Sequence, residues 1–494
     1  MKLISYKNFA YAALGTLALA ACKPKLDQTP ISKGKSLDFT KYVSVGNSLT
    51  AGFADGGLYR DVQMKSYPNY LAGQFKLVGG GDFPQPLFSE AQKNGSGYVQ
   101  ITGWTSTGSP IITPVTTELA VTNATTGQLA RHEGPNNNLG IPGLRMVEVT
   151  NASVAQLNPY FERLLPPLTA KKYTDFVAEA NPTFFTCWLG NNDVLGYATR
   201  GGDSTGIFVS GQYPISTTGI PGTITATPLF NASTDSLINK LTANGAKGVV
   251  ATIPDVATIP FVRTVNPAVA AANGGVFPRI TFPLSSGLTA AQANLAYQLA
   301  GFNSPGFTTG SNNYAVYITG GNRVLQMNPA IDFFLLSGQA TLTNATTGLS
   351  AGLGVVRPNP SFNPANPVGP ANFPVLANPI ADNIVLDRQE VTIIRTATTA
   401  FNTKLRSAAQ IKGLAIVDAD AIFNQIIQNN GIDGVSVNSA FISGGLFSLD
   451  GVHLTPKGYA IVANQFIKAI NTTYIAQIPL IDVNARNIRG VVFP

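Results

Sequence analysis

Four short runs of mostly apolar residues predict β-strands in this chain: Tyr42–Val45, Pro182–Leu189, Lys247–Pro254 and Leu414–Val417. The run Pro182–Leu189 is apolar at nearly every position, which is typical of a parallel strand with both faces covered. The first run leads directly into Gly46.

Segments with helical periodicity lie between and after these strands. Ser236–Ala243 places Leu237, Ile238 and Leu241 on one face. Asp387–Ile411 is the clearest helix, since Asp387 and Glu390 form a capping box. Its predicted apolar stripe consists of Ile393, Ile394, Ala397, Phe401, Leu405 and Ala408.

A last helix is predicted to begin at Thr455-Pro456, a capping residue followed by proline in the first turn. Its inner face would carry Tyr459, Val462, Phe466 and Ile470. Strands alternating with helices predict a three-layer α/β/α fold, in which a parallel sheet has helices on both faces. Active residues in such folds lie at the carboxyl ends of strands. Ser48 and Asn192 both follow predicted strands.

Three regions interrupt this alternation, and we interpret them as β- and loop-rich insertions near 95–136, 201–228 and 260–379. Residues 39–494 are therefore expected to form one enlarged domain. The sequence Thr-Asn-Ala-Thr-Thr-Gly occurs at 122–127 and again at 343–348. We predict a hairpin turn at each copy, and shared turn chemistry explains the repeat more simply than an internal duplication.

The first 21 residues have the composition of an export signal. Lys2 and Lys7 precede a short apolar run that ends in Leu19-Ala20-Ala21-Cys22, which resembles the bacterial lipobox. We therefore expect residues 1–21 to be removed, Cys22 to carry lipid and residues 22–38 to form a polar linker. The alternative is an ordinary signal peptide with a chance cysteine. Lys23 is not an acidic retention residue, so an outer-membrane lipoprotein is expected, on either face of that membrane.

Composition excludes several classes of function. The net charge is +7, from 32 basic and 25 acidic residues, but no run of Lys and Arg indicates a nucleic-acid surface. The two cysteines are Cys22 and Cys187. A lipidated Cys22 would leave no disulfide, and Cys187 would fill the core. No zinc spacing, phosphate-binding loop or dinucleotide fingerprint is present, so no metal or organic cofactor is implied. We expect a monomer.

Four short blocks supply the parts that acyl transfer needs. They are Gly46–Leu49, Asn138–Gly143, Gly190–Asp193 and Asp450–His453. Together they offer a nucleophile, oxyanion donors, and a base with its orienting carboxylate.

These blocks resemble those of the SGNH, or GDSL, hydrolase superfamily of esterases and lipases. Val45–Gly52 is similar to the nucleophile block of that family, and Ser66-Tyr67-Pro68 follows as in many members. Gly143, Asn192 and the pair Asp450 and His453 match the later blocks. The resemblance implies an SGNH- or flavodoxin-like fold. One departure is Asn47, which stands where the family usually has aspartate. That position carries no proton in the family, although the change could weaken a hydrogen bond that shapes the turn.

The resemblance implies a catalytic triad. Ser48 would be the nucleophile, His453 the general base and Asp450 the residue that fixes the imidazole tautomer. Taken alone, Ser48 is more typical of a helix cap than of a nucleophile. The chain has only one other histidine, His132, so the choice of base is narrow.

The oxyanion hole would consist of the backbone N–H groups of Ser48 and Gly143 and the side-chain amide of Asn192. Gly140 is a rival for Gly143. Asn192 could instead be a helix cap, and Asp193 would serve structurally. Trp188 is expected in the core, and the place of Trp104 stays open.

The function predicted from these residues is a serine ester hydrolase acting on a carboxylic ester. Its substrate could be a lipid with a long acyl chain, covered by an apolar lid containing Ile331–Leu336. Those residues could equally pack the core of their own insertion. The alternatives are a polysaccharide O-acetylesterase and a non-catalytic binding lipoprotein on the same fold.

Overall fold

The computed structural model describes residues 31–106, 108–202, 224–272, 277, 279–313, 315–320, 322–365 and 372–493. The predicted signal peptide, Cys22 and most of the predicted linker therefore lie outside the described residues, as does most of the 201–228 region. Within the described ranges, no helix combines the length and the apolar character needed to cross a bilayer.

A five-stranded parallel sheet forms the centre of the molecule, with the strand order β17-β8-β7-β1-β6. The strands are β1 (Tyr42–Gly46), β6 (Asn138–Gly140), β7 (Phe184–Trp188), β8 (Lys247–Ala251) and β17 (Ala415–Val417). The mixed α/β fold class and the four predicted strands are thus confirmed. The edge strand β6 was not predicted, because it is three residues long and begins with the polar Asn138. That side chain is buried, and its Oδ1 accepts a hydrogen bond from Ser44 Oγ at 3.1 Å.

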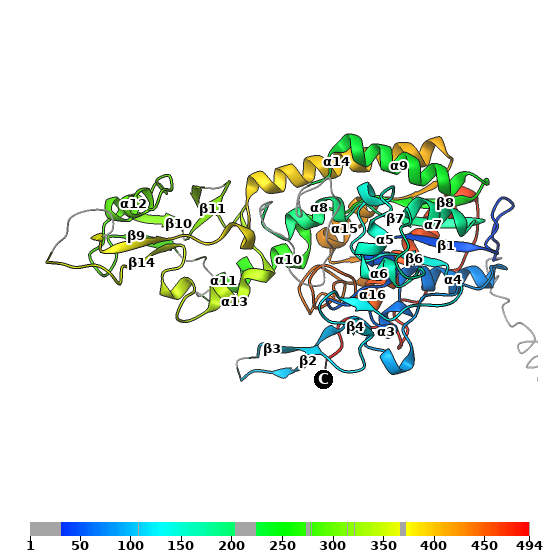
Figure 1. Cartoon of the computed structure of the whole chain (residues 1–494), viewed down its shortest axis with the longest axis horizontal. Coiled ribbons are helices and arrows are strands. Elements are labelled where there is room, and N and C mark those ends of the chain that lie inside the picture. The colour runs from blue at the N-terminus through cyan, green and yellow to red at the C-terminus, as the bar shows by residue number, and fades with distance from the viewer. Residues whose placement is uncertain are drawn as a thin grey trace, which may run out of the picture.

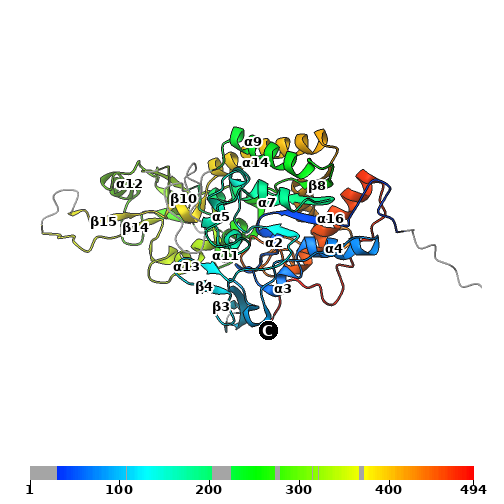
Figure 2. The same ribbon diagram turned by 45° about the vertical axis from the view of Figure 1, so that its right-hand side comes forward.

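Helices cover both faces of this sheet (Figures 1 and 2). One face carries α7 (Tyr173–Glu179), α9 (Thr227–Thr242) and α14 (Arg388–Ile411), and the other carries α4 (Tyr67–Leu77) and α16 (Pro456–Tyr474). Helix α9 begins nine residues before the predicted start at Ser236. Its first two turns contain Asn231, Ser233 and Thr234, which are weak helix formers and hide the pattern in the sequence.

The caps of the two long helices are formed as predicted. Asp387 Oδ1 accepts hydrogen bonds from the N–H groups of Gln389 and Glu390, and the Asp387 N–H donates to the Glu390 carboxylate. Thr455 Oγ1 caps α16 by accepting the Gly458 N–H at 3.1 Å. The predicted inner face of α16 is fully buried.

The apolar stripe of α14 is confirmed except at Ile393, which is 49% exposed. Neighbouring residues in a helix point about 100° apart. Only Ile394 of this pair can therefore face the sheet, and it is fully buried. Trp188 and Cys187 are also buried in the main core, as predicted.

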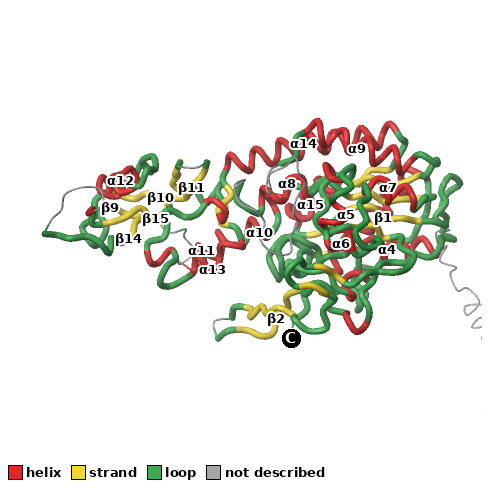
Figure 3. The backbone as a smooth tube through the Cα atoms, in the orientation of Figure 1, coloured by secondary structure: helices red, strands yellow, loops and turns green. Residues whose placement is uncertain are grey.

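The first insertion folds into two hairpins. The longer one pairs β2 (Tyr98–Trp104) with β3 (Pro110–Val115), and it projects from the body (Figures 1 and 3). The shorter one pairs β4 (Val121–Asn123) with β5 (Gln128–Leu129), so the hairpin turn predicted at 122–127 is confirmed.

The hairpin predicted for the second copy, 343–348, is wrong, because that segment follows helix α13 (Gln339–Thr343). The asparagines of the two copies, Asn123 and Asn344, nevertheless make the same turn. Each Oδ1 accepts the backbone N–H groups two and three residues ahead. Shared turn chemistry therefore explains the repeated sequence.

The third insertion contributes an elongated lobe, here called the insertion lobe (residues 265–385), which extends to the left in Figure 1. It contains helix α12 (Ala290–Leu299) and short antiparallel pairs such as β14 (Val355–Pro358) with β15 (Val375–Asn378). Two apolar clusters separate from the main core stabilise it.

The run Ile331–Leu336 packs at the base of this lobe. Phe334 belongs to a lobe cluster, whereas Phe333 and Leu335 join the main core, and only Ile331 is largely exposed. The segment therefore fills a core and does not form an exposed apolar lid.

Candidate active site

Sheet topology brings the first three sequence blocks together. Strand β1 lies between β6 and β7, and Gly46 at its end pairs with Gly140 on one side and Trp188 on the other. Parallel strands end at the same edge of a sheet. The segments that follow these three strands carry Ser48, Gly143 and Asn192. In addition, the Ile141 N–H donates to the Gly46 carbonyl at 3.0 Å.

Ser48 begins the short helix α2 (Ser48–Ala51), directly after β1. The turn is tight at Gly46, where a Cβ would lie 2.1 Å from Thr50 Oγ1 and 2.4 Å from the Trp188 carbonyl. Asn47 caps α2, and its Oδ1 accepts the Leu49 N–H at 3.2 Å. Asn47 thus makes a local hydrogen bond in this turn, and the effect of replacing the usual aspartate on its strength stays a prediction.

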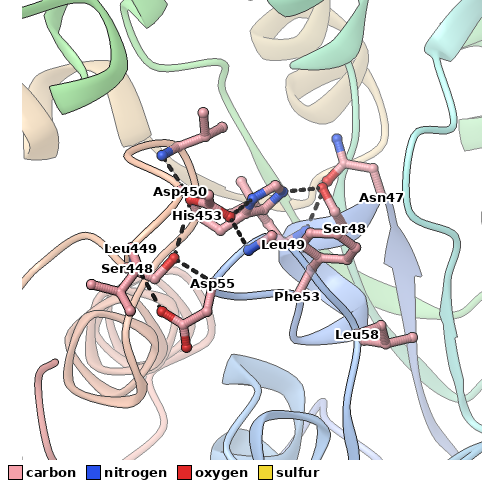
Figure 4. A network of polar contacts seen from close by, with 12 residues as sticks. Asn47, Ser48, Leu49, Phe53, Asp55, Leu58, Ser448, Leu449, Asp450 and His453 are labelled. Carbon is pink, nitrogen blue, oxygen red and sulfur yellow. Dashed lines mark hydrogen bonds and ion pairs between the residues drawn. The ribbon is translucent and has the colours of Figure 1, made fainter. Parts of the chain in front are cut away.

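The structure joins Ser48, His453 and Asp450 in a line of hydrogen bonds, although 405 positions separate Ser48 from His453 (Figure 4). Ser48 Oγ lies 2.8 Å from His453 Nε2, and His453 Nδ1 lies 2.8 Å from Asp450 Oδ2. If the Nδ1–H donates to the carboxylate, Nε2 keeps its lone pair for the serine proton. The Phe53 ring packs against the imidazole, with 4.6 Å between ring centroids.

Asp450 is held by several donors besides the imidazole. Its Oδ1 accepts the N–H groups of Val452 and His453, each at 2.8 Å, and its Oδ2 accepts the Gly56 N–H at 3.0 Å. Burial acts to raise the pKa of this carboxyl. The neighbouring His453 and these hydrogen bonds outweigh burial and hold the pKa well below its usual range. Asp450 is thus ionised at neutral pH and accepts the Nδ1–H.

The loop after β6 carries the proposed oxyanion glycine. Gly143 has a φ of +81°, which suits glycine, and the Asn158 amide fixes the loop by donating to the Pro142 carbonyl at 3.0 Å. Asn192 lies beside this loop, since its Nδ2 donates to the Leu144 carbonyl at 3.0 Å. One N–H of that amide stays available for another acceptor.

The rival glycine, Gly140, occupies a different environment. It lies inside β6, and its N–H already donates to Asn138 Oδ1 at 3.1 Å. The geometry therefore favours Gly143 as the backbone donor. Asp193 is fully buried, and its carboxylate accepts the Met146 N–H and the Thr225 hydroxyl, each at 2.6 Å. This matches the structural role predicted for it.

Asp55 and Ser448 are parts of this site that the sequence did not reveal. Asp55 accepts the Leu449 N–H, and Ser448 Oγ donates to Asp450 Oδ1 (Figure 4). The only local signal was an Asp-Gly turn seven residues after Ser48. Two other residues lie in the first insertion. His132 contacts the Pro135 carbonyl there, and Trp104, 49% exposed on β2, stacks on Phe493. Among the described residues, no group of three His, Cys, Asp or Glu side chains could hold a metal ion.

Part of the chain matches a known protein family. A family model described as GDSL-like Lipase/Acylhydrolase matches residues 340–466, about a quarter of the chain. The matched segment contains Asp450 and His453, whereas Ser48 lies outside it. No curated protein and no solved structure matches the chain.

Proposed function

We propose that this chain, a member of the SGNH/GDSL hydrolase superfamily, is a serine ester hydrolase that acts through an acyl-enzyme. The observation that carries the proposal is the hydrogen-bonded line from Ser48 through His453 to Asp450. An intact line of this kind supports the enzyme over a non-catalytic binding protein on the same fold.

The first half of the reaction forms an ester on Ser48. As Ser48 Oγ attacks the substrate carbonyl carbon, its proton moves to His453 Nε2. Asp450 stabilises the resulting imidazolium through the Nδ1–H bond. His453 then donates this proton to the leaving alkoxide, and the C–O bond of the substrate breaks.

The second half repeats this chemistry with water. His453 takes a proton from water, the hydroxide attacks the acyl carbon, and the free acid leaves as Ser48 regains its proton. In both halves negative charge develops on the carbonyl oxygen. The Ser48 and Gly143 N–H groups and the Asn192 amide would stabilise it, and one such donor is typically worth about 3 kcal/mol.

Replacement of the nucleophile tests this proposal. Ser48→Ala should abolish turnover of a short aryl ester, while the melting temperature stays that of the wild type. Ser89→Ala is the matched control, because Ser89 lies outside the site and bonds only Gln92 locally. Turnover by Ser48→Ala at the wild-type rate would refute the mechanism.

For the substrate, we propose an ester with a short acyl chain, such as an acetylated glycan. The apolar run that favoured a lid, Ile331–Leu336, is largely buried in the cores.

A chain-length series of aryl esters tests the acyl preference. We expect kcat/KM to be highest for acetate or butyrate and at least about tenfold lower for laurate, since each tenfold step needs only about 1.4 kcal/mol. A rate that rises with chain length would favour a lipid substrate instead.

We also propose that Cys22 anchors the enzyme to the outer membrane through a lipid. The lipobox-like sequence Leu19–Cys22 supports this proposal. Cys22→Ser should move the protein out of the membrane fraction after export. If the variant still sediments with membranes, the anchor lies elsewhere, and the apolar tail from Ile475 is the next segment to test.

A further inference from the structure

Asp55 is a second carboxylate near the proposed site. It contacts Ser448 and Leu449, the two residues that precede Asp450. Its Oδ1 accepts the Leu449 N–H at 2.9 Å, and its Oδ2 accepts the Tyr59 hydroxyl at 2.7 Å. Its own N–H donates to Ser448 Oγ at 3.0 Å. Figure 4 shows the contacts of Asp55 with Ser448 and Leu449.

Both segments, the one with Asp55 and the one with Ser448, also donate hydrogen bonds to the Asp450 carboxylate. Ser448 Oγ donates to Asp450 Oδ1 at 3.1 Å, and the Gly56 N–H donates to Asp450 Oδ2 at 3.0 Å. Asp55 and Gly56 are neighbours in the chain. The turn at Asp55 therefore holds both the backbone before Asp450 and one carboxylate oxygen of Asp450 itself.

The first insertion contacts the turn at Asp55 and packs against Tyr59. The Val99 N–H donates to the Asp55 carbonyl at 2.9 Å, and the rings of Tyr59 and Tyr98 stack with 3.9 Å between centroids. Asp55 has a φ of +54°, in the left-handed region that few residues other than glycine adopt, although aspartate does so more readily than most. Contacts from three segments of the chain thus fix its position.

We propose that Asp55 is a positioning residue for the reaction, which holds the Ser448–Asp450 turn so that the Asp450 carboxylate faces His453. The proposal rests on the esterase function inferred above. It also gives the first insertion a role, since the hairpin that begins at Tyr98 holds Asp55 in place.

The charge of Asp55 adds an electrostatic effect. Burial raises its pKa to about 6, and Asp450 acts in the same direction. The hydrogen bonds from Leu449 and Tyr59, and the nearby His453, act in the opposite direction. The groups facing it are Asp450, His453, Tyr59, Tyr98 and Tyr459. Above about pH 6 the ionised Asp55 favours a protonated imidazole, as Asp450 does.

Two variants of Asp55 and one control test the proposal. Asp55→Ala removes both acceptors. Asp55→Asn keeps an oxygen for the Leu449 N–H and can donate to the Tyr59 oxygen, but it carries no charge. Asp61→Asn is the control, because Asp61 is an exposed carboxylate on the neighbouring helix α3 (Arg60–Gln63) and bonds Lys65.

We expect Asp55→Ala to lower kcat about 10- to 100-fold on an aryl ester with little change in KM, since misplaced catalytic groups cost rates of this order. Asp55→Asn should keep most of the activity at pH 8, and the acid limb of its kcat/KM profile should move to lower pH by at least about 0.3 unit. The profile of Asp61→Asn should superimpose on the wild type.

Wild-type kcat in Asp55→Ala, or an unmoved acid limb in Asp55→Asn, would overturn the proposal. If Asp55→Ala does not fold, the profile of Asp55→Asn decides alone. Failure of the esterase function would look different, because the wild type itself would then neither turn over esters nor react with a phosphonate at Ser48.

Discussion

Replacement of Asp450 by asparagine isolates the effect of the carboxylate on the base. The new amide must place its NH₂ group where either Oδ1 or Oδ2 now lies. At Oδ1 it would face the N–H groups of Val452 and His453, and at Oδ2 it would face the Gly56 N–H and the imidazole. The second orientation leaves one backbone donor without an acceptor instead of two, so we expect it to prevail.

In that orientation the amide donates to His453 Nδ1, and the imidazole proton moves to Nε2. His453 then points an N–H at Ser48 Oγ and cannot accept the serine proton. A wrong tautomer of this kind costs about 10⁴-fold in kcat in a serine protease, a value taken from that other system, and we expect a similar loss here. The loss corresponds to about 5 kcal/mol of activation free energy. The unpaired Gly56 N–H should lower stability by about 1–3 kcal/mol.

The assay is kcat/KM for a short aryl ester, with urea unfolding to measure stability and Asp235→Asn, an exposed residue paired with Lys404, as the control. The folded pKa of Asp450 is depressed, so the stability it contributes is present above its unfolded pKa of about 4 and is lost as the pH falls further. The stability gap between wild type and variant should therefore close below about pH 4. Activity within tenfold of the wild type would refute the role assigned to Asp450.

Three further outcomes are expected. Asn192→Ala should lower kcat about 100- to 1,000-fold with KM nearly unchanged, which steady-state kinetics measures. Gly140→Ala should lower the melting temperature, because its Cβ would lie 2.3 Å from the Ala51 nitrogen, and an unchanged melting temperature would contradict this packing. Burial raises the pKa of Glu390 to about 9, so the stability it contributes at low pH is lost between about pH 4 and pH 9. Glu390→Gln should thus raise the melting temperature more at pH 8 than at pH 5. An equal rise at both pH values would contradict the raised pKa of Glu390.

The sequence predicted the elements whose signals are local. Strands β1, β7, β8 and β17 are apolar runs, and helices α14 and α16 begin at capping residues that the structure confirms. The blocks with Ser48 and Asn192 could be placed together because both follow predicted parallel strands, which end at one edge of a sheet. The other two blocks were joined to them by the family resemblance.

The features that were missed depend on long-range contacts. Strand β6 is short and polar, and its pairing with β1 decides that it is a strand. Asp55 contacts Leu449 across 394 positions, and nothing near Asp55 in the sequence indicates that contact. Likewise, Ile331–Leu336 could have covered a ligand or filled a core, and only its packing distinguishes the two.

Covalent labelling shows whether Ser48 is the nucleophile and His453 its base. Incubation of the folded wild type with an aryl phosphonate, followed by peptide mass mapping, should place one adduct on Ser48. His453→Ala, which lacks the base, should label at least about 100-fold more slowly. An adduct on another residue, or no adduct on folded wild-type protein, would contradict the roles proposed for Ser48 and His453.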